Sequence, residues 1–390
     1  MNWGHATSTD LVKWNFDSIS VTAPAVNADS MDLSPWWGTA VIKGDTKYAW
    51  IDSWGEGLYR YNTFSNGEWK NKEAITGADN LKKSEPFVFW NENTDRWNMI
   101  AYNRTDSTIN ILNSPEGLHW TKTSTFNFKF GFASMIELPV DRKPDDTRWL
   151  FITESGNYLL GSFDGNELTL LSPLRQFNHG GNVGGSICFN DRQKDRVIMV
   201  SELKGEQQAD LPSNGQLSFP VEISLHNYST GVEMIQKPLP ELKNYYRKTY
   251  TWTDKKVYPG INKNLLAPVK GEMLHFKGTI DLGNCDYFGF ILRSDRENKG
   301  SEIIYNVSQG QFNVPDNVIK YKPANNKIDF EMLVDRSSIE LFIEGGRYVV
   351  STTFAPEPKN QKYILYSIGG EIVVDQLEVN TIKTAWRDEQ

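Results

Sequence analysis

Two glutamates, Glu85 and Glu137, are the residues whose type and spacing point most directly to chemistry. They lie 52 residues apart, and each stands near the start of an apolar, strand-like run. Cleavage of a glycosidic bond needs one carboxyl group that protonates the leaving oxygen and a second that attacks or activates water. Glu137 lies between Ile136 and Leu138, and an apolar setting favours the protonated form that a general acid requires. The pair therefore predicts a sugar-cleaving site with Glu137 as its acid, against the alternative that both are ordinary solvated residues.

Other residues near strand starts offer groups that contact sugars. Trp36 and Trp37 have aromatic faces for stacking on a sugar ring, or they fill a hydrophobic core, and the sequence favours neither. His179 and Asn182 flank a pair of glycines at the start of a later strand and are candidates for polar contacts, although a plain turn explains the glycines equally well. The five histidines are scattered without metal-ligand spacing, so we expect no metal and no cofactor.

The chain repeats itself with a period of about 50 residues, which is typical of a β-propeller. Short runs of aromatic and β-branched residues alternate with clusters of Gly, Asn, Asp and Ser, so each repeat reads as three or four strands. The opening segment, Trp3–Trp14, matches only the later part of a repeat, which predicts five blades with the first incomplete. A β-sandwich with accidental spacing is the alternative. The repeats begin at Trp36, Ser84, Met135 and Asn182.

The strand pattern changes after about residue 225. Residues 226–246 contain Lys237-Pro-Leu-Pro, and proline favours an extended chain, so we expect a linker there. Residues 247–390 hold more strictly alternating strands, which suggest a two-sheet sandwich. The predicted organisation is all-β, with a catalytic-type propeller over 1–225, a linker over 226–246 and a β-sandwich over 247–390.

Composition narrows the classes of partner. The 390 residues carry a net charge of −8 and no basic stripe, so we do not expect nucleic acid as a partner. No apolar run approaches the ~20 residues of a membrane helix, so we expect no membrane span. The 13 Trp, 16 Tyr and 20 Phe suit a carbohydrate binder, although most of them are expected to fill β cores.

Three segments resemble glycoside hydrolase family 32, the invertases, inulinases and levanases. Trp3–Trp14 resembles its W-G-H-A-x-S-x-D-L-x-x-W segment, Leu160–Gly165 resembles its G-x-F-D-G turn, and Val334–Gly346 resembles its sandwich-domain signature. The resemblance implies a five-bladed propeller followed by a β-sandwich. It also implies hydrolysis, with retention, of β-fructosides such as fructans or sucrose, and an extracellular or periplasmic location.

The resemblance also implies roles for individual residues. The family's acid/base lies in an E-C-P segment, which Glu137-Leu-Pro matches with Leu in place of Cys. Its transition-state stabiliser lies in an R-D-P segment, where this chain has Ser84-Glu-Pro, so Glu85 takes the stabiliser's place and Ser84 takes that of the sugar-contacting Arg. The S-G-S-A segment becomes Trp37-Gly-Thr-Ala. The nucleophile belongs to an N-D-P-N-G segment upstream of Trp3, and no such segment occurs in this sequence.

Without a nucleophile the covalent route of a retaining glycosidase is lost. General acid catalysis alone typically accelerates a reaction by only ~10²–10⁴-fold. We therefore expect a β-fructosidase-type glycosidase of impaired activity, shortened at its start. The alternative is a non-catalytic carbohydrate-binding relative of the same fold, which the altered R-D-P and S-G-S-A segments favour. A protein-interaction propeller without a sugar ligand is a third, weaker alternative.

Overall fold

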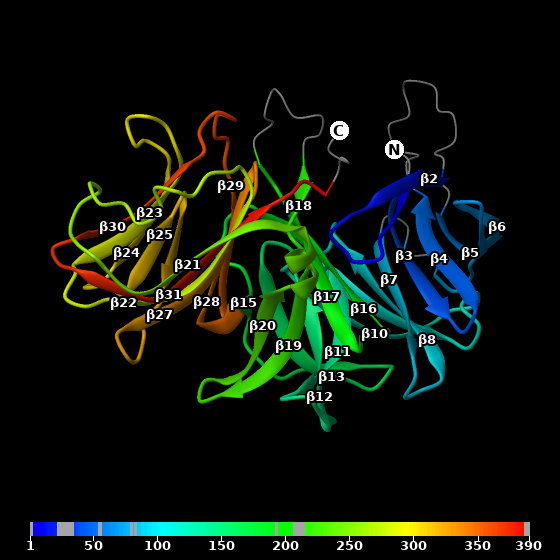
Figure 1. Ribbon diagram of the computed structural model, residues 1–390. Coiled ribbons are helices and arrows are strands. Elements are labelled where there is room, and N and C mark those ends of the chain that lie inside the picture. The colour runs from blue at the N-terminus through cyan, green and yellow to red at the C-terminus, as the bar shows by residue number, and fades with distance from the viewer. Residues whose placement is uncertain are drawn as a thin grey trace. The chain divides into compact units, whose positions relative to one another are not determined.

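The structure is a computed structural model that describes residues 3–21, 35–53, 57–78, 81, 84–191, 194–205 and 215–385. Its regular structure is almost entirely β-strand, which confirms the all-β prediction (Figure 1). Backbone contacts divide the chain into two compact units. The first comprises Met1–Glu137, Arg148–Thr153 and Leu159–Pro173, and the second comprises Leu138–Thr147, Glu154–Tyr158 and Leu174–Gln390.

Antiparallel sheets in the first unit match the predicted repeats. A two-stranded sheet comes first, as expected for a partial unit, and two four-stranded meanders follow (Figure 1). The inner strands of the meanders begin at Pro35 and Ser84, close to the predicted starts. The strands are β1 (Trp3–Thr7) and β2 (Asn15–Val21); β3 (Pro35–Lys43), β4 (Thr46–Ser53), β5 (Gly57–Ser65) and β6 (Glu68–Ala74); and β7 (Ser84–Asn91), β8 (Arg96–Asn103), β9 (Thr108–Ser114) and β10 (Thr121–Asn127).

The last two repeats begin at Ser134 and Val183, again close to the predicted starts. A single parallel residue pair, Val140 with Leu225, joins β11 to β19. The strands are β11 (Ser134–Val140), β12 (Lys143–Ile152), β13 (Asn157–Phe163), β14 (Leu168–Leu170) and β15 (Arg175–Gln176), then β16 (Val183–Asp191), β17 (Arg196–Leu203), β18 (Gln216–Leu217), β19 (Val221–Tyr228) and β20 (Gly231–Pro238).

Equivalent hydrogen bonds connect successive repeats of the first unit. The indole Nε1 of Trp50 donates to the carbonyl oxygen of Gly117 at 2.9 Å, and the amide of Asn98 donates to that of Gly165 at 2.7 Å. Both donors are fully buried, both bonds span 67 residues, and each acceptor lies just after the third strand of the next repeat. The repeat seen in the sequence is therefore accompanied by equivalent hydrogen bonds between neighbouring repeats.

The range 226–246, predicted as a linker, is largely regular structure instead. β20 pairs with β19 along its whole length, from Gly231 opposite Tyr228 to Pro238 opposite Val221, and the 3-10 helix η2 (Pro240–Tyr245) follows. The prolines do favour an extended chain, as expected. An extended chain that finds a neighbouring strand becomes part of a sheet, and the local sequence does not reveal that neighbour.

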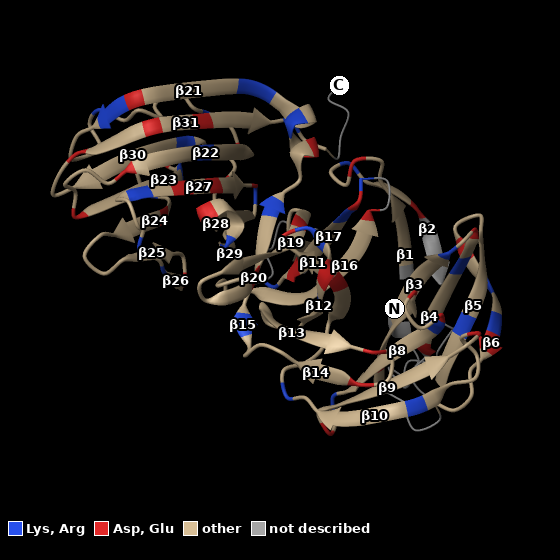
Figure 2. Ribbon diagram, turned by 90° about the horizontal axis from the view of Figure 1, so that it is seen from below, with Lys and Arg blue, Asp and Glu red and all other residues tan. Residues whose placement is uncertain are grey.

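The C-terminal part of the chain is a sandwich of two antiparallel sheets. The six-stranded sheet has the order β21-β31-β22-β27-β28-β29, and the five-stranded sheet has the order β26-β25-β24-β23-β30. Their inner faces share one apolar core that includes Phe276, Phe290 and Leu365. β21 carries basic positions towards both of its ends and a single acidic position, Asp254 (Figure 2). The elements are β21 (Tyr246–Val257), β22 (Leu274–Asp281), β23 (Tyr287–Ser294), β24 (Ser301–Asn306), β25 (Gln311–Val314), β26 (Asn317–Lys320), β27 (Lys327–Val334), β28 (Ser338–Ile343), η3 (Glu344–Gly346), β29 (Tyr348–Thr353), β30 (Lys362–Ile368) and β31 (Ile372–Ile382).

Candidate active site

Glu85 is a buried carboxylate at the second position of β7, with 5% of its surface exposed. The hairpin of β7 and β8 sets Glu85 opposite Tyr102. The chain then turns, and Nε of Arg104 donates to Oε1 of Glu85 in an ion pair. The guanidinium also lies over the Tyr102 ring, 6.0 Å from its centroid. A buried carboxylate needs such a partner, so Arg104 fixes the orientation of the Glu85 side chain.

Arg104 was not predicted from the sequence. The resemblance places an arginine directly before the stabilising carboxylate, where this chain has Ser84, and the structure brings a guanidinium to Glu85 from the next turn instead. The signal was available, because a tight β7–β8 hairpin places the residue just beyond the partner of Ser84 close to Glu85.

Thr39 fixes the backbone beside Glu85. Its hydroxyl donates to the carbonyl oxygen of Pro86 at 2.9 Å and accepts from the amide of Val88 at 3.2 Å. Thr39 belongs to the Trp37-Gly-Thr-Ala segment on β3, so this segment joins two inner strands next to the carboxylate. A threonine there has a structural role whatever the ligand.

Glu137 is half-buried on β11. Its chain neighbours Met135, Ile136 and Leu138 are 2%, 8% and 4% exposed, and the role of Glu137 as the general acid stays a prediction. Glu137 is the fourth residue of its inner strand and Glu85 is the second of its own. An offset of two residues keeps side chains on the same face of a strand, so the two glutamates occupy related positions in their repeats.

Two further buried polar groups lie at the same ends of the inner strands. Ser84 is 1% exposed, and its Oγ atom makes no hydrogen bond with any described residue. Asp52, near the end of β4, is 2% exposed, and its backbone pairs with Trp37 at the start of β3. Asp52 was missed because a single acidic residue after an apolar run carries no distinctive spacing. Sugar contact by Ser84 stays a prediction.

His179 and Asn182 are held against the sandwich strand β29. The amide of His179 donates to the carbonyl oxygen of Val349 at 2.7 Å, and the side chain of Asn182 donates to Oγ1 of Thr353 at 3.0 Å. Burial lowers the pKa of the His179 imidazole. A Cβ atom on Gly180 would lie 1.9 Å from the carbonyl oxygen of Ser351, so close packing accounts for that glycine. A role of His179 or Asn182 in sugar binding stays a prediction.

The backbone of Trp36 and Trp37 lies on β3, and their side chains fall outside the described residues. Across the described ranges, no group of three or more His, Cys, Asp or Glu side chains is arranged to hold a metal ion. The same ranges contain no helix long and apolar enough to cross a membrane.

Two family models together cover almost the whole chain. The model described as the glycosyl hydrolases family 32 N-terminal domain matches residues 1–238, and the model described as glycosyl hydrolases family 32 C terminal matches residues 241–381. The chain belongs to glycosyl hydrolase family 32. The two models meet between residues 238 and 241, where β20 ends and η2 begins.

Curated family 32 proteins match this chain at low identity. A levanase of Bacillus subtilis (strain 168) is 23% identical over 99% of this chain and 65% of its own length. A levanase of Bacillus sp. (strain L7) is 24% identical over 100% of this chain and 49% of its own length. The chain thus spans about half to two thirds of the length of these relatives.

Solved structures show the same fold. The exo-inulinase of Aspergillus awamori superposes with a TM-score of 0.83 at 16% identity, over 99% of this chain and 90% of that one. The β-fructofuranosidase of Schwanniomyces occidentalis superposes with a TM-score of 0.78 at 17% identity, over 98% and 88%. This family 32 chain is all-β and has the fold of these structures, a β-propeller followed by a β-sandwich, as predicted.

Proposed function

We propose that this protein is a β-fructosidase-type glycoside hydrolase that acts on fructans or on sucrose-like β-fructosides. The observation that carries the proposal is the buried, ion-paired carboxylate of Glu85 at the start of one inner strand, with Glu137 at the related position of the next. The names of the matched relatives, levanase, inulinase and invertase, support the substrate class.

Each glutamate has a separate task in the proposed reaction. Glu137 gives its proton to the glycosidic oxygen as the bond from that oxygen to the anomeric carbon breaks, and later takes a proton from the water that attacks this carbon. The Glu85 carboxylate, which is paired with Arg104, stabilises the positive charge that develops on the fructosyl ring.

The decisive test is release of reducing sugar from levan, inulin and sucrose. It is measured with this chain and with the chain extended upstream along its coding frame, because the resemblance places a third carboxylate before Trp3. We expect Glu137→Gln to lower kcat by ~10²–10⁴-fold in whichever form is active. Arg104→Met removes the partner of a buried carboxylate and should lower kcat/KM by roughly tenfold or more.

Glu167→Gln is the matched control, because Glu167 is an exposed glutamate in the turn before β14. It should leave activity unchanged. Equal activity of the parent and Glu137→Gln would remove Glu137 from the mechanism. Levan binding without hydrolysis by either form would favour the non-catalytic carbohydrate-binding relative instead.

A further inference from the structure

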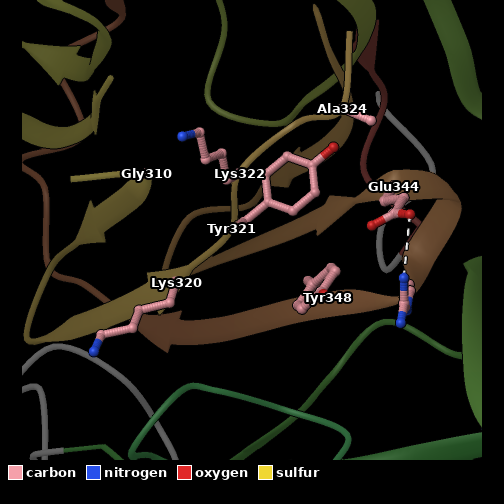
Figure 3. Close-up of a pocket in the computed structure, with 8 residues that line it drawn as sticks. Gly310, Lys320, Tyr321, Lys322, Ala324, Glu344 and Tyr348 are labelled. Carbon is pink, nitrogen blue, oxygen red and sulfur yellow. Dashed lines mark hydrogen bonds and ion pairs between the residues drawn. The ribbon is translucent and has the colours of Figure 1, made fainter. Parts of the chain in front are cut away.

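A pocket of about 430 Å³ opens on the sandwich, within the range of small-ligand sites. It lies where the edge strands of the two sheets, β26 and β29, come together. Lys320, Tyr321 and Lys322 follow one another along one wall, and Glu344 and Tyr348 come from the turn before β29 and its first residue (Figure 3). None of these residues belongs to the proposed hydrolytic mechanism.

Two tyrosine rings give the pocket an aromatic surface. The ring centroids of Tyr321 and Tyr348 are 5.3 Å apart with an interplanar angle of 54°, and both residues are half-buried. A half-buried ring is held by packing on one side and keeps area for a ligand on the other. The C–H face of a sugar ring is apolar and fits such a surface.

The Tyr348 wall is held rigidly. Nε of Arg347 donates to Glu233 at 2.7 Å, Nη1 donates to Glu344 at 3.3 Å, and the guanidinium lies 5.4 Å from the Tyr348 ring centroid. Hydrogen bonds to Glu233 raise the pKa of the Arg347 guanidinium further above its ordinary value, so its charge is fixed. A preformed wall lowers the entropy cost of binding.

The turn that carries Glu344 is equally constrained. Gly346 has φ +94°, and a Cβ atom there would lie 1.7 Å from the carbonyl oxygen of Gln236. Only glycine fits this close approach of two backbones without a shift. This close approach therefore constrains the backbone of the turn that carries Glu344.

The polar groups of the pocket are mixed in sign and in hydrogen-bonding type. Lys320 and Lys322 are exposed and make no ion pair with any described residue, so their ammonium groups are available as donors. Glu344 supplies acceptor oxygens, and its carboxylate would repel a phosphate. A sugar hydroxyl both donates and accepts, so it can use both kinds of group.

We propose that this pocket binds a segment of a neutral sugar chain, as a second sugar site made of residues other than Glu85 and Glu137. Tyr321 and Tyr348 provide the stacking surface, while Lys320, Lys322 and Glu344 hold the hydroxyl groups. That the chain is a fructan rests on the proposed function. Such a site keeps a polymer attached between cleavage events and adds nothing for a disaccharide.

The test is affinity electrophoresis in native gels that contain levan or inulin, with dextran as the reference polymer. All variants carry Glu137→Gln so that the polymer is not consumed. We expect Tyr321→Ala to weaken fructan binding roughly tenfold, about 1.4 kcal/mol. Tyr321→Phe keeps the ring and should bind like its parent, which separates loss of the aromatic surface from loss of the hydroxyl.

Tyr258→Ala is the matched control, since Tyr258 is 55% exposed on the sandwich and does not line the pocket. Thermal unfolding checks that each variant is folded, and Lys320→Ala with Lys322→Ala offers a second, exposed perturbation that should also weaken binding. Unchanged retardation of both pocket variants overturns the proposal, as does equal loss in Tyr258→Ala. Displacement of the polymer by inorganic phosphate overturns it in favour of an anion site.

Hydrolysis separates this proposal from the proposed function. In an active form with Glu137 intact, Tyr321→Ala should slow levan or inulin hydrolysis at low polymer concentration and leave sucrose hydrolysis unchanged. A chain that binds fructan through Tyr321 yet hydrolyses none refutes the proposed function and leaves the pocket standing. Polymer hydrolysis that is unchanged by Tyr321→Ala supports the proposed function and refutes the sugar site in the pocket.

Discussion

Replacing Glu340 by Gln should remove a pH dependence of stability from the sandwich. Glu340 lies on β28 and is 4% exposed. It accepts hydrogen bonds from the amide of Phe219 at 2.7 Å and from Oγ of Ser351 at 3.4 Å. No cation is among these partners, so burial dominates and raises the pKa of the carboxyl from 4.5 to about 7.

The direction of the effect follows from the raised pKa. A carboxyl group that is harder to ionise in the folded state contributes its full stability below pH 4.5, and that contribution is lost as the pH rises through about 7. A shift of this size corresponds to about 3 kcal/mol between pH 4 and pH 8. Gln keeps a carbonyl oxygen for the Phe219 amide and carries no charge, so Glu340→Gln should lack this loss.

The assay is urea unfolding followed by tryptophan fluorescence at pH 5 and at pH 8. At pH 8 the variant should have the larger free energy of unfolding, by up to about 3 kcal/mol, and at pH 5 the two proteins should agree within roughly 1 kcal/mol. Glu378→Gln, at an exposed position of β31, is the matched control and should show the parent's pH dependence. The same pH dependence in Glu340→Gln and in the parent would refute the reasoning.

Two more perturbations test other contacts of the second unit. Burial would raise the pKa of Glu241, but hydrogen bonds led by Arg196 lower it to about 2. Glu241→Gln should therefore lower the free energy of unfolding by about 2 kcal/mol at pH 7. In thermal melts, this difference between variant and parent should fade as the pH falls from 4.5 toward 2. Persistence of the full difference at pH 2 would contradict this. Gly346→Ala forces a Cβ atom against the Gln236 carbonyl and should lower the free energy of unfolding in urea by more than about 2 kcal/mol. Gly345→Ala is the control, because Gly345 has φ +64° but open space around it, and it should lower that free energy by about 1 kcal/mol. Equal losses in the two variants would show that the close approach at Gly346 is unimportant.

The repeating strands could be predicted because their signal is local and recurs. Runs such as that from Ser84 are short apolar stretches bounded by turn residues, and the structure begins its inner strands within two residues of the predicted starts. The related positions of Glu85 and Glu137 follow from that repeat. A periodic pattern needs no knowledge of what packs against it.

Contacts between distant segments could not be read in this way. Arg104 meets Glu85 through the register of a hairpin, and Tyr321 meets Tyr348 only because two sheet edges come together. Residues 231–238 become a strand because β19 lies beside them. In each case the contact or the strand depends on a partner that is distant in the sequence, and local propensity and residue spacing do not identify that partner.

The hydrogen bond from Trp50 to Gly117 also sets an order for biosynthesis. Trp50 is fully buried, and its indole proton has its acceptor 67 residues further along the chain. At ribosomal speeds of about 5–20 residues per second, that acceptor emerges roughly 3 to 13 s after the donor. The same interval separates the synthesis of Asn98 from that of its acceptor Gly165, because this hydrogen bond also spans 67 residues. During synthesis, therefore, each of these two buried donors gains its acceptor only after the third strand of the following repeat has been translated.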